Sequence, residues 1–295
     1  MQSVKKRLAR SGVLCRTDVA GASLTTFGSG GDAAVVAYPS SVEEVKSLLS
    51  LFGEEGVAYR VLGAGSNVLF PDEGYDGVIL RLDRLKTFSV NGVSVTVGAG
   101  LPMAVFSRKC REAALSGAEY AEGIPGKIGG AVYMNASAFG MGVSDALRSV
   151  DVILDGKEQT LPSSALKTEY HRGGIPAGAL ILSATFDLRK GEAGRIAEKM
   201  RELARKRAAT QPFGKSAGSV FRRVGEKPAA LYIEETGLKG RVVGGAELST
   251  KHCNFIVNRG GAKTEDFFVL AEEVRRAVKE RTGVTLEYET ERILC

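Results

Sequence analysis

The amino-acid sequence predicts an α+β fold, in which helices and antiparallel strands are mixed along the chain. Asn91-Gly92 and Asp155-Gly156 each lie between two runs of alternating apolar residues, a pattern typical of β-hairpins. In the stretch 264–282, apolar residues recur every three or four positions, as they do on one side of a helix. The hairpins argue against a doubly wound parallel sheet, in which a crossover helix separates successive strands.

Residues 1–85 are predicted to form the first of three domains. The clearest element is a helix, because Ser41 can cap its first turn and Glu44 follows three residues later. The boundary is placed near Leu85, where the hairpin pattern begins. The elements expected in this domain are strands at 32–39, 57–62 and 76–82 and a helix at 40–56.

Residues 86–208 are predicted to form the second domain and residues 209–295 the third. Pro102 in the first turn and Gly117 beyond the last turn delimit one expected helix of the second domain. The second domain is expected to contain hairpins at 85–100 and 147–161, helices at 101–117 and 191–209, and a strand at 178–188. The third is expected to contain strands within 216–224 and at 252–258 and 284–294, and helices at 228–237 and 264–282.

The composition disfavours several classes of protein. The net charge is only +6 and the basic residues are scattered, so we expect no nucleic-acid binding. The sequence has no run of about 18 apolar residues and no secretory leader, so we expect no membrane attachment and a cytoplasmic location. Disulfide and structural zinc sites are disfavoured by the isolated positions of Cys15, Cys110, Cys253, Cys295, His171 and His252.

Two glycine-rich stretches indicate that a large ligand approaches the backbone. Within 122–140, four glycines fall in eight residues among apolar neighbours, so we expect a buried segment with few side chains. The turn at 63–67 follows an expected strand. It differs from a GxGxxG motif, because Val68 replaces the third glycine and no regular helix follows. Its N–H groups could hold a pyrophosphate, although a simple tight turn is the alternative. One dinucleotide contacting both stretches would explain them.

Six strings occur in order along residues 25–291: TTFGSGGDA, LGAGSNVLFPDEGYDGVIL, EGIPGKIGGAVYMNASAFG, SAGSVF, KHCNFIVN and GVTLEYETE. Together they resemble the UDP-N-acetylenolpyruvoylglucosamine reductase family, in its shorter subclass without a tyrosine-bearing loop. The resemblance implies two FAD-binding subdomains of the vanillyl-alcohol-oxidase (PCMH) type and a C-terminal substrate domain. It implies FAD contacts at Gly63, Ala64, Gly65, Ser66, Asn67, Gly123, Ile124, Pro125, Gly126, Gly129, Gly130, Ala131, Asn135 and Ala136.

The family that these strings resemble reduces an enolpyruvyl ether to a lactyl ether in peptidoglycan precursor synthesis. NADPH reduces FAD, the flavin delivers hydride to the terminal alkene carbon, and a proton reaches the adjacent carbon. The resemblance places the proton donor at Ser219. It places at Glu289, with Glu287 as its neighbour, a carboxyl that holds or protonates the enolate. A cation should also face the substrate carboxylate as negative charge develops there.

The sequence departs from the family pattern at two places. The family arginine follows a tyrosine, and here the string reads EYHRGG. His171 takes this position without a gap and Arg172 takes it after a one-residue shift. We favour Arg172, because a guanidinium suits a carboxylate better than a neutral imidazole. Arg223 stands where the family has a substrate-binding asparagine and could replace it by pairing with a phosphate. Further substrate contacts are expected at Tyr170, Arg207, Lys215 and Asn254.

Two other functions fit parts of the pattern. Another FAD oxidoreductase of the same fold would explain the glycine stretches, but not Ser219 together with Glu289. A catalytically silent nucleotide-binding homologue would explain the departures at Arg172 and Arg223. The favoured interpretation predicts FAD, NADPH and a UDP-sugar enolpyruvyl ether as ligands, and a monomeric enzyme.

Overall fold

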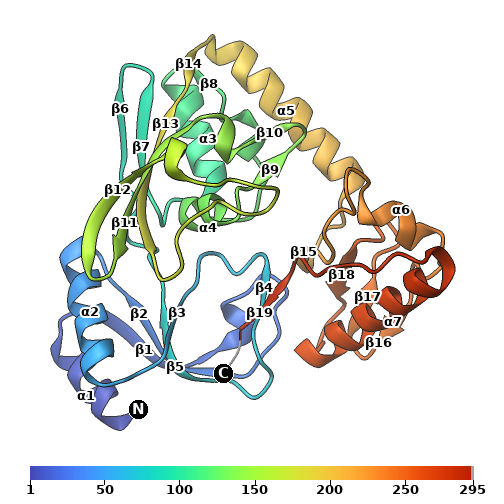
Figure 1. Ribbon diagram of the computed structural model, residues 1–295, viewed down its shortest axis with the longest axis horizontal. Coiled ribbons are helices and arrows are strands. Elements are labelled where there is room, and N and C mark those ends of the chain that lie inside the picture. Colours follow the sequence, from blue (N-terminus) through green and yellow to red (C-terminus); the bar gives the residue numbers. More distant parts are fainter. Residues whose placement is uncertain (294–295) are drawn as a thin grey trace. The chain divides into compact units, whose positions relative to one another are not determined.

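The computed structural model describes residues 1–293, and Figure 1 shows the course of the chain. By its internal contacts the chain divides into two units. The first comprises Met1–Arg16, Val35–Ala64 and Gly77–Arg207, and the second comprises Thr17–Ala34, Gly65–Asp76 and the chain from Ala208 onward. Each unit has its own cluster of buried apolar side chains. The division into three domains at residues 85 and 208 stays a prediction.

Most of the helices were predicted from the sequence. Ser41 caps α2 as expected, since its Oγ accepts a hydrogen bond from the Glu44 N–H at 3.2 Å. The helices α1 and α4 were not predicted; α4 lies inside the glycine-rich stretch. Within the described residues the α-helices are α1 (Gln2–Arg10), α2 (Val42–Glu54), α3 (Met103–Glu112), α4 (Ile128–Tyr133), α5 (Ala193–Thr210), α6 (Ala229–Glu234) and α7 (Thr264–Thr282).

The first unit contains an antiparallel sheet built from the two predicted hairpins. Its strand order is β12-β11-β13-β7-β6, with Asn91 opposite Ser94 and Leu154 opposite Lys157 at the hairpin ends. The strands are β6 (Phe88–Asn91), β7 (Ser94–Gly98), β11 (Leu147–Leu154), β12 (Lys157–Pro162) and β13 (Leu180–Asp187). Two short pairs accompany them: β8 (Leu115–Ser116) with β14 (Arg189–Lys190), and β9 (Ser137–Ala138) with β10 (Met141–Gly142).

A second sheet has the strand order β1-β2-β5-β3. Its strands are β1 (Leu14–Ala20), β2 (Asp32–Tyr38), β3 (Tyr59–Val61) and β5 (Tyr75–Leu80). The division between the two units falls within β1, β2 and β5. β3 and β5 are parallel neighbours, as expected for strands that a crossover connection separates.

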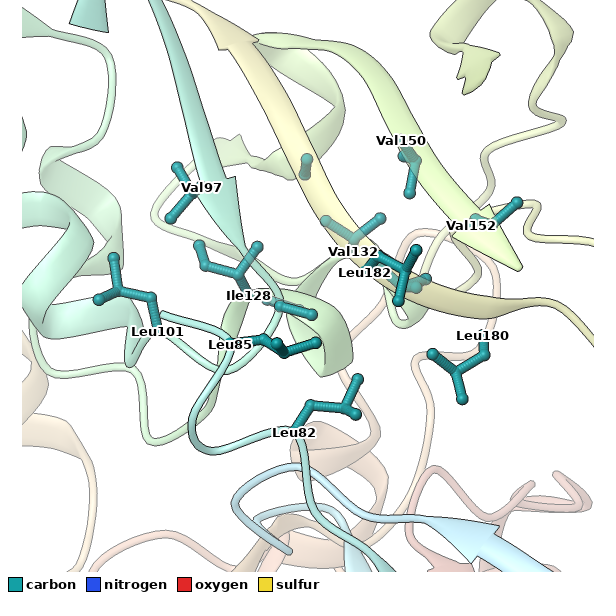
Figure 2. Packing of buried hydrophobic residues seen from close by; sticks show 14 of the residues in the cluster. Leu82, Leu85, Val97, Leu101, Ile128, Val132, Val150, Val152, Leu180 and Leu182 are labelled. Atoms are coloured by element: carbon teal, nitrogen blue, oxygen red, sulfur yellow. The ribbon is translucent and has the colours of Figure 1, made fainter. Parts of the chain in front are cut away.

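The core of the first unit fixes the glycine-rich stretch on the five-stranded sheet. Figure 2 shows Ile128 and Val132 of α4 among apolar side chains of the sheet, including Val97 and Leu182. Ile128 and Val132 are fully buried. The apolar residues between the glycines therefore anchor α4, and they determine which side of the helix stays accessible.

The second unit packs two helices and an antiparallel sheet of order β15-β18-β17-β16. Asp72 caps α7, because its carboxylate accepts the N–H groups of Thr264 and Glu265 at 2.9 Å each. Gly283 ends α7 with φ +75°, a conformation that favours glycine. The strands are β15 (Lys215–Ser219), β16 (Val242–Val243), β17 (Ala246–Leu248) and β18 (Phe255–Asn258), with a separate parallel pair of β4 (Val68–Leu69) and β19 (Glu291–Arg292).

The predicted closing strand at 284–294 is wrong for most of its length. Only β19 is a strand there, because residues 287–290 contact residues 220–222, just after β15, through single hydrogen bonds rather than a continuous ladder. Leu294 and Cys295, the last residue of that prediction and one of the four cysteines, lie outside the described residues.

Candidate active site

The turn at 63–67 brings two backbones into close approach. Gly65 has φ +67°, and a Cβ there would lie 2.3 Å from the Leu24 carbonyl oxygen, so only glycine fits. At Gly63, by contrast, an added Cβ would meet no atom within 4 Å. The turn therefore packs on one side against residues 24–26 and leaves open space beside the half-buried backbone of Gly63, which suits an anionic group that binds N–H donors.

The glycine-rich stretch is less buried than the sequence analysis predicted. Gly123, Pro125 and Gly130 are exposed, and an added Cβ at Gly130 would meet no atom within 4 Å. Gly129 instead faces the sheet, where an added Cβ would lie 3.1 Å from the Ala99 Cβ. The prediction of a buried segment is wrong at these exposed positions, because the apolar residues turn inward and leave Gly123 and Gly130 outside. The result is an accessible surface of backbone.

A tight turn next to α4 carries the two candidates for the family arginine. Glu169 and Arg172 exchange backbone hydrogen bonds at 2.8 and 3.1 Å, and His171 occupies a left-handed conformation with φ +53°. Asn135 holds this turn, because its Nδ2 donates to the Glu169 carbonyl at 3.1 Å. The Tyr170 and His171 rings lie 4.1 Å apart, while the Arg172 side chain is exposed. Arg172 is thus displayed on a fixed turn in the same unit as the glycine-rich stretch.

Arg207 lies at the end of α5 against this stretch. An added Cβ at Gly123 would be 3.3 Å from both Cδ and Nε of Arg207, and the guanidinium lies 5.4 Å from the Phe139 ring. The Arg207 side chain is partly buried, which lowers its pKa from the usual value. It remains charged, because an arginine pKa starts far above neutral pH. A fixed cation therefore lies beside exposed backbone.

Ser219 and Glu289 come together in the second unit although they are far apart in sequence. The Glu289 N–H donates to the Val220 carbonyl at 2.9 Å. The Thr290 hydroxyl donates to the Ser219 carbonyl at 3.0 Å. Ser219 is the last residue of β15 and pairs with Phe255 of β18. Backbone contacts thus fix both predicted catalytic residues on the same strand end.

The Glu289 carboxyl is strongly perturbed. Only 7% of the residue is exposed, and burial raises the pKa of Glu289 to about 8, partly offset by the positive charge of Arg222. At neutral pH the carboxyl therefore holds a proton, unlike an ordinary surface glutamate. A buried acid that is protonated at neutral pH can donate a hydrogen bond or a proton, and such perturbed groups are common in active sites.

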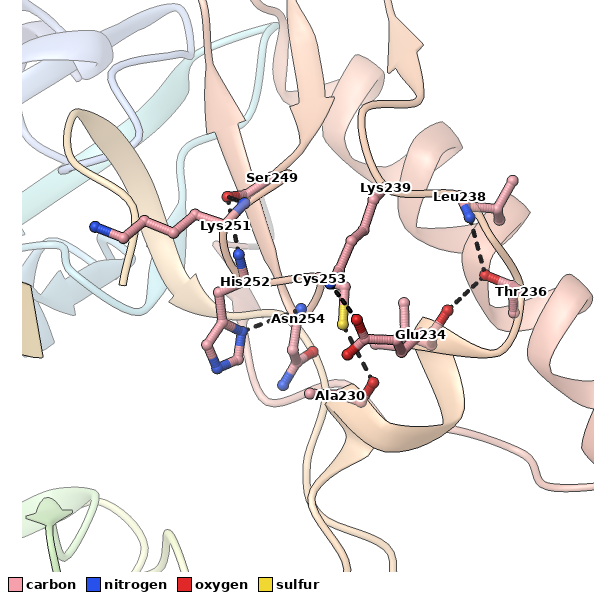
Figure 3. Close-up of polar contacts among 11 residues, drawn as sticks. Ala230, Glu234, Thr236, Leu238, Lys239, Ser249, Lys251, His252, Cys253 and Asn254 are labelled. Atoms are coloured by element: carbon pink, nitrogen blue, oxygen red, sulfur yellow. Dashed lines mark hydrogen bonds and ion pairs between the residues drawn. The ribbon is translucent and has the colours of Figure 1, made fainter. Parts of the chain in front are cut away.

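Asn254 lies in a loop that shapes the end of β15. Its Oδ1 accepts from the Phe221 N–H at 3.0 Å and its Nδ2 donates to the Phe221 carbonyl at 2.8 Å. Figure 3 shows the rest of the loop, in which Nδ1 of His252 accepts from the Asn254 N–H at 3.3 Å and the Cys253 thiol donates to the Ala230 carbonyl. The Asn254 amide is engaged with backbone, which favours a role in positioning the strand over direct substrate contact.

The remaining predicted substrate contacts are on the surface of the second unit. Lys215 is exposed, and its Cδ would lie 2.9 Å from a Cβ added at Gly28. Arg223 is exposed and lies 3.6 Å from the Glu226 carboxylate in a solvent-accessible pair. Such pairs contribute little to stability, so a ligand phosphate can compete for this guanidinium.

Comparison with known proteins shows to which family the chain belongs. A family model described as UDP-N-acetylenolpyruvoylglucosamine reductase, C-terminal domain, matches residues 209–293, and a model described as FAD binding domain matches residues 33–161. The UDP-N-acetylenolpyruvoylglucosamine reductase of Halalkalibacterium halodurans is 38% identical over 273 residues, which is 91% of each chain. That of Lachnoclostridium phytofermentans is 37% identical and covers 98% of this chain and 95% of its own length. The chain belongs to the UDP-N-acetylenolpyruvoylglucosamine reductase family.

Solved structures agree with this membership and with the predicted fold class. The crystal structure of the reductase from Thermus caldophilus has a TM-score of 0.82 and 34% identity, covering 96% of this chain and 99% of that one. An alkyldihydroxyacetonephosphate synthase shares the fold over 64% of this chain, with a TM-score of 0.50 and 14% identity. The prediction of an α+β FAD-binding fold with an added C-terminal domain is confirmed.

Sequence analysis missed Thr290 and Arg222, which act on the predicted reductase residues from neighbouring positions. The only available signal was adjacency, because Thr290 follows Glu289 and Arg222 follows the SAGSVF string. Within residues 1–293, no cluster of histidine, cysteine and acidic side chains is arranged to hold a metal ion. In that same part of the chain, no helix is both long and apolar enough to cross a membrane.

Proposed function

We propose that the chain reduces UDP-N-acetylenolpyruvoylglucosamine to UDP-N-acetylmuramate in peptidoglycan precursor synthesis. Membership of the family makes it an FAD-dependent oxidoreductase that uses NADPH. The observation that carries the residue assignment is Glu289, a buried carboxyl with a pKa of about 8 held on the same strand end as Ser219. A protonated acid beside a serine suits a reaction that ends in proton transfer.

The residues fit FAD on physical grounds. The open space beside the Gly63 backbone suits the pyrophosphate, and the exposed backbone at Gly130 suits a flat ring, because an added Cβ at either glycine would meet no atom within 4 Å. Gly123 is also exposed, with the Arg207 side chain beside it. We propose that residues 63–67 and 123–136 make these contacts. When bound, FAD supplies the hydride that the terminal alkene carbon receives. Asn135 and Ala136 also hold the C-terminal end of the stretch, since both form hydrogen bonds within the first unit.

Ser219 and Glu289 are assigned to the proton-transfer step that follows hydride addition. Hydride addition to the terminal carbon leaves negative charge on the carbon that bears the carboxylate. We assign Ser219 as the donor of the proton to that carbon, because a carbanion is basic enough to take a serine proton where water is excluded. Glu289 is protonated at neutral pH and donates a hydrogen bond to the enolate, so the developing charge is stabilised without a buried anion alongside it.

Arg172 is assigned to the substrate carboxylate. Its turn is fixed by the backbone pair with Glu169 and by Asn135, so the guanidinium projects from a defined place. A guanidinium offers two parallel donors to a carboxylate, whereas a neutral imidazole offers one. Tyr170, at the same turn, is assigned to the substrate pocket. His171 is the competing candidate, and its left-handed backbone favours a structural role at the turn.

The diphosphate of the substrate requires cations. Arg207, Lys215 and Arg223 are proposed for this role because each carries a charge on or near the surface of its unit. Asn254 is proposed to act indirectly, through the backbone of Phe221. In this account Arg223 replaces the asparagine that the family has at this position.

The setting of the enzyme is proposed from its chemistry. A nucleotide-sugar substrate and NADPH favour the cytoplasm, and the thiols of Cys15, Cys110 and Cys253 are unbridged, as expected in a reducing compartment. We propose that the enzyme acts as a monomer with no nucleic-acid or membrane partner.

An anaerobic half-reaction tests the function. The purified protein is reduced with NADPH, UDP-N-acetylenolpyruvoylglucosamine is added, and the oxidised flavin absorbance is followed. Rapid return of that absorbance with formation of the lactyl ether supports the proposal. Reduction without reoxidation would overturn the substrate assignment while leaving a flavoprotein.

A further inference from the structure

Residues 65–67, the part of the cofactor turn in the second unit, are bonded to the segment that carries Glu289. The Asn67 Nδ2 donates to the Glu289 carbonyl at 2.9 Å. The Glu291 N–H donates to the Asn67 carbonyl, also at 2.9 Å. Beyond this point β4 and β19 continue as a parallel pair, with Glu291 opposite Val68. The Glu289 backbone is therefore held by the Val220 carbonyl on its N–H and by the Asn67 side-chain amide on its carbonyl.

The same turn is also tied to the strand that carries Ser219. The Thr26 hydroxyl donates to the Ser216 carbonyl of β15 at 2.7 Å, and the Thr26 N–H donates to the Gly65 carbonyl at 3.0 Å. An added Cβ at Gly218 would lie 3.6 Å from the Ser66 carbonyl oxygen. Residues 65–67 thus contact both catalytic segments, directly at Glu289 and through Thr26 at β15.

Close packing at Gly65 restricts movement of residues 65–67. At Gly65 the backbone approaches Leu24 so closely that no side chain fits. A shift of the turn must therefore move residues 24–26 with it or break its hydrogen bonds, because packed contacts transmit displacement rather than absorb it. Glu289 is sensitive to such a shift, since its raised pKa depends on burial.

We propose that Asn67 is a positioning residue through which occupancy of the cofactor turn sets the geometry of Ser219 and Glu289. The inference rests on the proposed function for the roles of those two residues. In this arrangement, FAD binding at the turn restrains the Glu289 segment through the Asn67 amide. In the cofactor-free protein the Glu289 segment is then less restrained and its carboxyl is more solvated. The buried, protonated carboxyl therefore forms only when FAD is bound.

Hydrogen–deuterium exchange tests the coupling without relying on turnover. Peptides covering 286–293 report the Glu289 and Glu291 N–H groups, which bond to Val220 and Asn67. We expect FAD to slow their exchange in the wild type about tenfold, the effect of roughly one hydrogen bond. In Asn67→Leu, which keeps the side-chain size but has no donor, FAD should protect residues 65–67 and no longer protect 286–289.

The matched control is Asn258→Leu. The Asn258 Nδ2 also donates to a backbone carbonyl at 2.9 Å, that of Phe27. The Asn258 backbone lies opposite Lys215 of β15, but its side chain bonds to Phe27, Gly28, Gly260 and Ala262 rather than to the Glu289 segment. Asn258→Leu also loses the bonds that its side chain makes to Gly28, Gly260 and Ala262, so it is the more disruptive of the two substitutions. Even so, only Asn67→Leu should remove the effect of FAD on 286–289 and shift the alkaline limb of the pH–rate profile. In FAD-loaded Asn67→Leu, reoxidation of the reduced flavin by substrate should slow about tenfold.

Three results would overturn the proposal. One is exchange at 286–293 that does not respond to FAD in the wild type, a result that needs no variant. Another is Asn67→Leu that binds FAD and keeps the wild-type protection and pH profile. The third is an equal effect of Asn258→Leu. Failure of the proposed function is separate, because it would appear as wild-type protein that is not reoxidised by the enolpyruvyl substrate, whatever the exchange data show.

Discussion

The glycine-rich stretch at 123–136 and the pair Ser219–Glu289 present opposite parts of the chain to their ligands. In the stretch, apolar side chains such as Ile128 point into the core and leave glycine backbone at the surface. At the pair, hydrogen bonds to the Ser219 and Val220 carbonyls hold the segments that carry the two reactive side chains. The first region recognises a shape, and the second performs chemistry. Substitutions should therefore change cofactor affinity in the first and rates in the second.

The largest effect is expected from Ser219→Ala. If this hydroxyl supplies the proton, reoxidation of the reduced flavin by substrate should slow about 100- to 10 000-fold, the usual contribution of a positioned acid. Reduction by NADPH needs no such proton and should be unchanged. Rapid-mixing absorbance measurements of the two half-reactions separate these steps.

Ser216→Ala is the matched control for Ser219→Ala. Ser216 lies on the same strand, three residues earlier, and the substitution keeps the carbonyl that Thr26 contacts. Its half-reactions should match the wild type. An equal loss in both variants, or a Ser219→Ala enzyme that is reoxidised normally, would refute the assignment of the proton donor.

Arg172→Ala should have the next largest effect. Loss of the cation that faces the substrate carboxylate should lower kcat/KM about 100-fold, comparable with the loss of a donor that stabilises transition-state charge. His171→Asn is the control, because asparagine tolerates the positive φ at that position and keeps the turn intact. Steady-state kinetics on both variants decides between the two residues. Normal turnover of Arg172→Ala with loss in His171→Asn would mean that the histidine fills the arginine position.

Glu289→Gln tests the raised pKa through the pH dependence of rate. Because the wild-type pKa is about 8, the carboxyl loses its proton as the pH rises through that value, and substrate-dependent reoxidation should fall with it. The amide has no proton to lose, so the variant should be slower but should lack this limb. Pre-steady-state rates of flavin reoxidation, measured at pH values below and above 8 in the wild type and the variant, test this prediction.

The same substitution has a predicted effect on stability, with a defined sign. The folded protein keeps the Glu289 proton up to about pH 8, whereas in the unfolded chain the glutamate has its ordinary pKa of 4.5. The stabilising contribution is therefore present at low pH and is lost as the pH rises from the lower value through the higher one. Denaturant unfolding of the wild type should show this loss, and Glu289→Gln should not. Glu287→Gln, an exposed neighbour, is the control and should resemble the wild type.

Elements with local sequence signals were predicted, whereas elements that depend on tertiary contacts were not. The helix at 264–282 and both hairpins were predicted, because periodicity and turn dipeptides are local signals. The short helix α4 was missed, since glycines at 129 and 130 mask its pattern and only packing on the sheet stabilises it. The closing strand was overpredicted, because residues 287–290 make single contacts with residues 220–222 rather than a ladder.

The candidate site, too, was predictable only where local sequence carried the signal. Ser219, Glu289 and the glycines were named through family strings, whereas composition and spacing alone gave only a large ligand near the backbone. The contacts of Asn67, Thr26 and Thr290 could not be predicted, because each joins segments distant in sequence. Burial of Glu289, which raises its pKa, also depends on this tertiary packing and has no counterpart in the local sequence.

The smallest effect is expected in the glycine-rich stretch, at Gly130→Ala. An added Cβ meets no atom of the protein within 4 Å, and alanine favours a helix over glycine by about 0.5–1 kcal/mol, so the cofactor-free protein should become slightly more stable. If the flavin lies against this backbone, the methyl group should weaken FAD binding several-fold, so that the loaded protein gains less or none. Gly194→Ala in α5, also without close neighbours, should stabilise both forms equally. Thermal unfolding of each variant with and without FAD gives four midpoints, each of which is compared with that of the wild type. Equal stabilisation of both forms by Gly130→Ala would show that the cofactor does not contact this position, and the proposed surface would have to lie elsewhere on the stretch.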